Sequence, residues 1–329
     1  MIKIFCKGLC VVLAILLGCM VNGAMAASEL GSPAETKATL SSDYTQLVEN
    51  AFPKFDAPAL KIRFQGIAMK YTTSLDTIKV RDLRGLEQLM NINLQQHAPE
   101  LKVFKQEGLS YEVNPDIGKI RFYSAIQTPL ALTRAVGLQR LPEFTQRHEA
   151  VIAQMGVPQD QIFFNKTSLL LTEGSTNPKD GAVRKTEPVV TGVTTHVIRA
   201  IDGIIVEGSY AKVSSFSPDK INAVHLNWPR LQLHPTFNNF EPRNQQSLKQ
   251  AIADRVKAIA GSEKANVKMA VVLLPVTEGG VTHMTPVMKV GVRTESGGEG
   301  VIFYEGLSDQ AIQIEKPAND SVSGGAQGR

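Results

Sequence analysis

Residues 187–228 constrain the fold more than any other stretch, because they carry the longest uninterrupted strand signal in the chain. Apolar positions alternate along this stretch, and turn signals at Asp202-Gly203 and at residues 217–220 divide it into three strands. One face of the last strand is wholly apolar, carrying Val224, Leu226 and Trp228. We therefore predict an antiparallel meander that buries one of its two faces.

Residues 1–26 are typical of a secretory signal peptide. Lys3 and Lys7 precede an apolar run at residues 9–21, and the small-x-small pattern Ala24-Met25-Ala26 follows it. The run is shorter than the roughly 20 residues that span a bilayer, and no later stretch is comparable. We therefore expect an exported protein, periplasmic or secreted, without a stable transmembrane segment after cleavage.

Cleavage after Ala26 would remove all three cysteines, Cys6, Cys10 and Cys19, so we expect no disulfide and no cysteine chemistry. It would also lower the formal charge from +4 to +2, because two lysines and no acids are lost. That balance gives no reason to expect a nucleic-acid partner. An alternative stays open: residues 16–19, LLGC, resemble a lipobox, which would make the protein an envelope lipoprotein anchored through Cys19 and serving a structural role.

After the leader, we predict a flexible lead-in at residues 27–40 and an N-terminal α+β domain at residues 41–139. Ser41 or Ser42 is expected to cap a short helix that Pro53 ends. The further elements expected in this domain are a strand at 61–72, a helix at 81–96, and a hairpin of strands 109–113 and 119–125.

Two more helix-plus-strand units are expected, at residues 140–235 and 236–310, with a disordered tail at 311–329. The first begins with a helix at 142–155, for which Pro142 suits the first position and Gly156 the C-terminal cap. Its buried stripe would contain Phe144, His148, Val151, Ile152 and Met155. The other elements expected are strand 161–172, an exposed polar loop at 173–187, the meander, helix 245–260, and strands 267–276, 283–294 and 301–304. The fold class predicted is α+β, with helices packed on twisted antiparallel sheets.

Within this pattern, HVIRAIDGIIVEGSYAKV at residues 196–213, with its turn Gly203-Ile204-Ile205-Val206, resembles the fungalysin/thermolysin-type propeptide domain. The later stretches VVLLPV, PVMKVGVRT and GVIFYEG resemble, in order, the PepSY domain that follows it in such propeptides. The resemblance covers about residues 140–308. It implies tandem cystatin-like units that bind a protein partner, as an inhibitor or propeptide-like chaperone of a secreted metalloprotease.

The protease itself is missing from the sequence. His148-Glu149 begins like the helical zinc motif, but Ile152 stands where the second histidine must lie to share the metal. The six histidines show no ligand spacing: His97, His148, His196, His225, His234 and His283. We therefore expect a non-enzymatic protein with no cofactor and no metal centre.

Two histidine positions leave alternatives open. His148 could be a metal ligand or general base, or a residue at the edge of a buried helix stripe. His225 is expected on the sheet face opposite Trp228, and could form a site with His234 only if the chain folds back near Pro229. The rival function is that of a secreted effector or hydrolase, in which His196 or His225 would act with Asp202, although a turn aspartate usually bonds its own backbone.

The residues expected to contact a partner are Trp228, Arg230, His225 and Tyr210. Tryptophan and arginine are favoured anchors of protein interfaces, whereas a lone tryptophan at the end of a strand is also a common core residue. An exposed edge strand of such a sheet offers a second route, because it can pair with an extended peptide.

Overall fold

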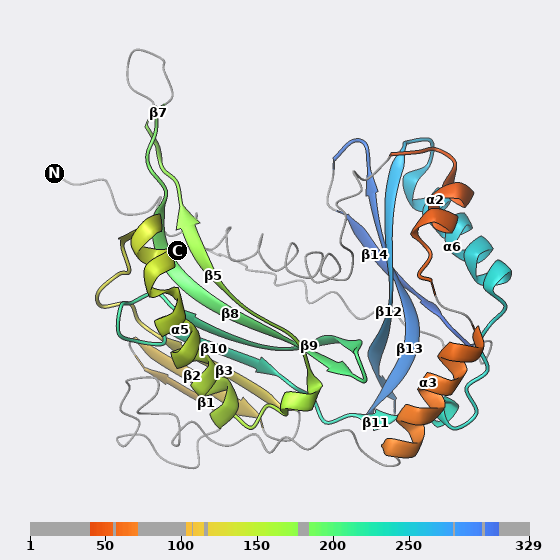
Figure 1. Ribbon diagram of the computed structural model, residues 1–329, viewed down its shortest axis with the longest axis horizontal. Coiled ribbons are helices and arrows are strands. Elements are labelled where there is room, and N and C mark those ends of the chain that lie inside the picture. The colour runs from red at the N-terminus through yellow and green to blue at the C-terminus, as the bar shows by residue number, and fades with distance from the viewer. Residues whose placement is uncertain are drawn as a thin grey trace, which may run out of the picture. The chain divides into compact units, whose positions relative to one another are not determined.

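The computed structural model describes residues 40–54, 57–71, 103–106, 108–114, 118–176, 184–278, 280–297 and 300–308. The fold is α+β, with helices and a large mixed sheet (Figure 1). The chain divides into two compact units. The smaller contains Met1–Pro53, Lys249–Ala270 and Lys289–Phe303, and the larger contains the remainder. The leader, most of the lead-in, the helix expected at 81–96 and the tail lie outside the described residues.

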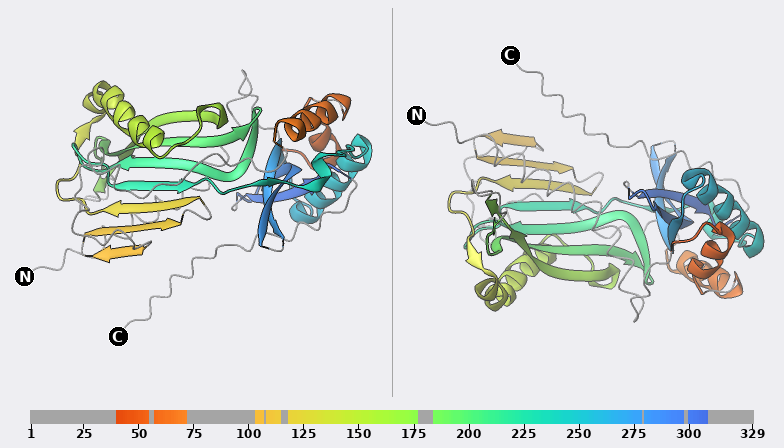
Figure 2. Two further views of the ribbon diagram at one scale, coloured as in Figure 1. Left: turned by 90° about the horizontal axis from the view of Figure 1, so that it is seen from below. Right: turned by 90° about the horizontal axis from the view of Figure 1, so that it is seen from above.

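The larger unit contains an antiparallel array of strands that includes the predicted meander (Figure 2). The meander is confirmed as β8 (Val189–Ile201), β9 (Ile204–Ser215) and β10 (Ala223–Asn227). The strand predicted at 161–172 is confirmed as β5 (Ile162–Thr172), which pairs antiparallel with β8. The predicted hairpin is also confirmed, as β2 (Leu109–Asn114) and β3 (Lys119–Ser124). It joins the same array through β3 and β10, while β1 (Val103–Gln106) pairs with β2.

Helix α5 (Arg134–Gln154) lies across one face of this array (Figure 1). The predicted start at Pro142 is wrong: the helix begins eight residues earlier, where the Thr133 hydroxyl accepts a hydrogen bond from the Val136 amide at 3.3 Å. Pro142 therefore lies inside the helix. Gly156, just after the helix, has a φ of 81°, a left-handed conformation suited to glycine.

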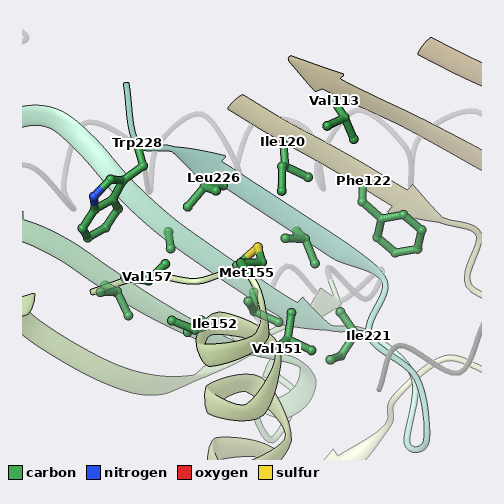
Figure 3. Close-up of a cluster of buried hydrophobic side chains, with 14 residues drawn as sticks. Val113, Ile120, Phe122, Val151, Ile152, Met155, Val157, Ile221, Leu226 and Trp228 are labelled. Atoms are coloured by element: carbon green, nitrogen blue, oxygen red, sulfur yellow. The ribbon is translucent and has the colours of Figure 1, made fainter. Parts of the chain in front are cut away.

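The predicted stripe of α5 is buried against the strands. Val151, Ile152 and Met155 pack in one apolar cluster with Leu226 and Trp228 (Figure 3). The strands contribute the alternate residues that point toward the helix, and these include Val113, Ile120, Phe122, Val197, Ala211, Val213 and Val224. The opposite face of the array carries the remaining residues of each strand.

The strand pairing is irregular near the hairpin that joins β8 and β9. The registers of β8 with both neighbours shift close to Arg199, between Ile198 and Ala200 on the β9 side. Such bulges bend a strand and increase its twist. The turn that follows is confirmed at Asp202 and Gly203, whose φ values of 47° and 76° suit a tight two-residue hairpin.

Helix α3 (Ala57–Lys70) replaces the strand predicted at 61–72, so that prediction is wrong. Its buried residues are Leu60, Phe64, Ile67 and Ala68, a spacing of one helical face. The Phe64 ring lies 5.6 Å from that of Phe237 and 4.7 Å from that of Phe240. These ring contacts hold α3 against the η4 turn (Pro235–Phe237) in the larger unit.

The smaller unit holds α2 (Tyr44–Ala51) and most of α6 (Gln245–Ala260). Helix α6 has the predicted bounds. Helix α2 is also confirmed, but its cap is Asp43, which accepts from the Gln46 amide at 3.0 Å, rather than Ser41 or Ser42. The Tyr44 hydroxyl reaches the Glu263 carbonyl oxygen at 2.7 Å and ties α2 to the end of α6.

The three C-terminal strands are confirmed in longer form, as β12 (Ala265–Glu278), β13 (Val281–Thr294) and β14 (Val301–Gly306). The division between the units falls within β12 and β13. Short strand β11 (Gln232–Leu233) pairs with β13 in parallel, which makes the sheet mixed rather than purely antiparallel. In the loop expected at 173–187, β6 (Ser175–Thr176) pairs with β7 (Arg184–Lys185).

Candidate functional site

The candidate residues lie on opposite faces of the array in the larger unit. His148 of α5 and Trp228 after β10 belong to the face that α5 covers. Tyr210 and His225 alternate with core residues Ala211 and Val224, so they belong to the helix-free face, by which we mean the face of this array opposite α5, on which the described residues place no helix.

On the covered face, His148 forms a closed hydrogen-bond network with two strands. Its Nδ1 lies 2.8 Å from Thr195 Oγ1 of β8, and its Nε2 lies 2.9 Å from Ser215 Oγ of β9. Thr195 Oγ1 lies a further 2.8 Å from Thr167 Oγ1 of β5. His148, Thr195 and Ser215 are each 0% exposed. Burial, followed by the charge of Arg147, lowers the pKa of His148 to about 3.

The distances in this network match a serine nucleophile beside a histidine base, with a third group orienting the imidazole. The surroundings oppose that chemistry. Ser215 offers no surface to a substrate, the third group is a threonine hydroxyl, and a base whose pKa is about 3 takes up protons poorly near neutral pH. We interpret the network as structural, because it satisfies the polar atoms of a buried imidazole and fixes α5 to β8 and β9.

Trp228 is completely buried, so its ring belongs to the core and is closed to a partner. Its Nε1 donates to Gln161 Oε1 at 3.3 Å. Arg199 lies over the ring, 5.2 Å from its centre, and donates from Nε to the same Gln161 oxygen at 2.9 Å and from Nη1 to the Pro229 carbonyl at 2.9 Å. Arg199 lies two residues after Val197 in β8, so strand alternation puts both on one face, and this alternation is the signal that could have identified the cluster.

The helix-free face brings together residues that the sequence had left apart. The strand registers align Lys166, His196, Lys212, His225, Arg121 and Glu112 across β5, β8, β9, β10, β3 and β2. Residues directly opposite each other on neighbouring strands share a face. We call the first five the basic row. Tyr210 lies beside it, opposite Asn227, with its ring 5.8 Å from that of His196.

The electrostatics of the basic row follow from this alignment. Partial burial, then the charge of Lys212, lowers the pKa of His196. The pKa of His225 is lowered by partial burial, then by Lys212 and Arg121. The Arg121 guanidinium lies 3.9 Å from a Glu112 carboxylate oxygen, and both side chains are exposed, so this pair contributes little to stability.

The rival hydrolase site is not assembled. Asp202 lies at the hairpin tip, six residues beyond His196, or about 20 Å along an extended strand. Its Oδ1 lies 3.4 Å from Lys70 Nζ. His234 pairs with His283, at 5.6 Å between ring centres, rather than with His225. Arg230 is exposed just after β10.

Neither the described residues nor the comparisons with known proteins add a further site or a family. Among those residues, no group of three or more metal-ligating side chains could hold a metal ion. No helix in the described part of the chain combines the length and hydropathy that crossing a membrane requires. The sequence matches no protein-family model and no curated protein.

Proposed function

We propose that this chain is an exported, non-enzymatic protein-binding module that acts as an inhibitor or propeptide-like chaperone of a secreted metalloprotease. The proposal includes a cleaved signal peptide and two tandem cystatin-like units that resemble the metalloprotease propeptide and PepSY domains. Its structural support is the element order: helix α5 is followed by antiparallel strands, and helix α6 by β12, β13 and β14.

The observation that carries the proposal is the separation between the two faces of the array. The group that most resembles a catalytic pair, His148 with Ser215, is sealed between α5 and the sheet. The polar side chains of the helix-free face follow straight lines across the strands instead of converging on one point. An extended polar surface of this kind suits contact with another macromolecule better than the orientation of a small substrate.

Binding to a purified metalloprotease tests the proposal. The chain from residue 27 to 329 would be mixed with metalloproteases secreted by the same organism, and complex formation and peptidase inhibition would be measured at micromolar concentration. Complexes weakened by Tyr210→Ala or His225→Ala but retained by the exposed control Arg134→Gln would support it. The absence of both complex and inhibition across the set would reject it.

Two measurements address the alternatives. A broad hydrolase panel that detects activity in the wild type and loses it in His225→Ala would favour the effector or hydrolase function. Mass spectrometry of the mature N-terminus separates secretion from lipidation: a chain that begins at Ala27 cannot carry a lipid on Cys19, whereas a lipidated Cys19 would favour the envelope lipoprotein.

A further inference from the structure

We propose that the basic row binds an acidic protein segment in an extended conformation, with carboxylates of the partner lying over Lys166, His196, Lys212, His225 and Arg121. The inference rests on the proposed protein-binding function and specifies the chemistry of the partner. It concerns one surface of the larger unit, on the array formed by β5, β8, β9, β10 and β3.

The first argument is geometric. Five side chains that carry or can accept a positive charge occupy successive strands at matched register positions. Neighbouring strands lie about 4.8 Å apart, so the row extends for about 19 Å. An extended peptide advances about 3.4 Å per residue, so six or seven residues would cover it, with alternate side chains facing the row.

The second argument is charge. Lys166, Lys212 and Arg121 are basic side chains, and the acid that the registers of the described strands align with the row is Glu112, at the end beyond Arg121. Partial burial, and then the neighbouring positive charges, lower the pKa values of His196 and His225. A carboxylate placed over the row would offset the repulsion among these basic side chains. The row is therefore electrostatically complementary to an acidic partner.

The third argument favours a protein segment over a bilayer or a nucleic acid. The central residues His196, Lys212 and His225 are half-buried, while Lys166 and Arg121 at the ends are exposed. A slender chain can reach the centre, whereas a flat membrane surface would meet mainly the ends. Tyr210 beside the row supplies an aromatic edge, a group that suits peptide contacts. The formal net charge of the whole chain is only +4, which would attract a long polyanion such as a nucleic acid weakly.

Fluorescence anisotropy with defined peptides tests the inference. The probe is a labelled ten-residue peptide of alternating Glu and Ser, and its matched control replaces every Glu with Gln. The full chain should bind the Glu peptide and not the Gln peptide, and added salt should weaken the binding. The double variant Lys212→Gln with Arg121→Gln should reduce the affinity about tenfold, or about 1.4 kcal/mol, because two charged contacts with the peptide are lost.

The control double variant is Arg134→Gln with Lys257→Gln, which removes the same charge from exposed positions on α5 and α6. It should bind the Glu peptide as the wild type does. Lys166→Gln, on the exposed edge strand, provides a milder row variant, and circular dichroism verifies that each variant is folded. Equal loss in the row and control variants, or no loss in the row variants, would overturn the inference.

Competition assays identify the occupant. Single-stranded DNA or vesicles rich in phosphatidylglycerol that bind more tightly than the Glu peptide would also overturn the inference. The proposed function is tested separately, with the metalloprotease complex. A complex that forms but is unaffected by the row variants rejects the acidic-segment inference alone, whereas the absence of any complex rejects the proposed function.

Discussion

Acidification should destabilise the fold through His148, and the structure gives the magnitude. The pKa of this imidazole is about 3 in the folded chain and 6.5 when it is exposed. Above pH 6.5 it is neutral in both states and contributes no pH dependence. Below pH 6.5 the imidazole becomes protonated in the unfolded state but stays neutral in the folded state. The free energy of unfolding therefore decreases as the pH is lowered from 6.5 to about 3. At about 1.4 kcal/mol per pH unit, the loss between pH 7 and pH 5 is about 2 kcal/mol.

The variant His148→Gln isolates this contribution. Glutamine does not titrate, and its amide can bond to the hydroxyl of Thr195 or Ser215. The variant should be less stable than the wild type at pH 7, because one of these bonds is lost, but it should lack the 2 kcal/mol loss at pH 5. His196 and His225, whose pKa values are also lowered, are present in both proteins and cancel in the comparison.

Urea unfolding at pH 7 and pH 5 provides the assay. Trp228 is the only tryptophan of the chain and is completely buried, so its fluorescence reports loss of this core directly. Stabilities come from linear extrapolation of the transitions. If wild type and His148→Gln lose equal stability between the two pH values, within about 0.5 kcal/mol, the account of a buried neutral imidazole is refuted.

Three further predictions address other parts of the larger unit. Gly118→Ala should destabilise the fold by about 3 kcal/mol or more, because the added Cβ would lie 1.9 Å from the Trp228 carbonyl oxygen; a thermal melt unchanged from wild type would contradict this. Thr133→Ala should lower stability by about 1 kcal/mol, because the Thr133 hydroxyl caps the start of α5, and urea unfolding with no change would contradict this. The Glu peptide should bind more tightly at pH 6 than at pH 8, since bound carboxylates raise the pKa values of His196 and His225 next to Lys166, Lys212 and Arg121; anisotropy that shows equal or weaker binding at pH 6 would count against it.

Strand alternation made the meander predictable, and helical spacing did the same for α6. Their signals are local and strong, since every second or every third to fourth residue is apolar over a long stretch. Helix α3 was mistaken for a strand because Ile62 and Met69, which are 70% and 78% exposed, add apolar residues outside its buried face. Those two residues obscure the helical spacing of Leu60, Phe64 and Ile67.

The start of α5 was missed for a different reason. The first turns contain the apolar residues Val136 and Leu138, but these are 40% and 53% exposed and do not form a buried stripe. Pro142 looked like a helix start because proline suits the first helical position, where its missing amide costs nothing. The helix instead continues through Pro142 because its N-terminus is fixed by the Thr133 cap and its C-terminal half by the buried stripe.

The basic row could not be predicted from the sequence alone. Arg121 and His225 are about 100 residues apart in the chain, and they face each other only because β3 pairs with β10 in one register. A shift of one residue would turn one of them to the covered face. The sequence did place His225 opposite Trp228, because alternation within one strand is a local property.

The dissociation constant of the chain with a metalloprotease secreted by the same organism tests the central claim most directly. It would be measured by isothermal titration for the wild type, for Tyr210→Ala and for Arg134→Gln. The account predicts micromolar or tighter binding that Tyr210→Ala weakens and Arg134→Gln leaves unchanged. Heats indistinguishable from dilution for the wild type, or equal affinities for all three proteins, would contradict a binding module that acts through its helix-free face.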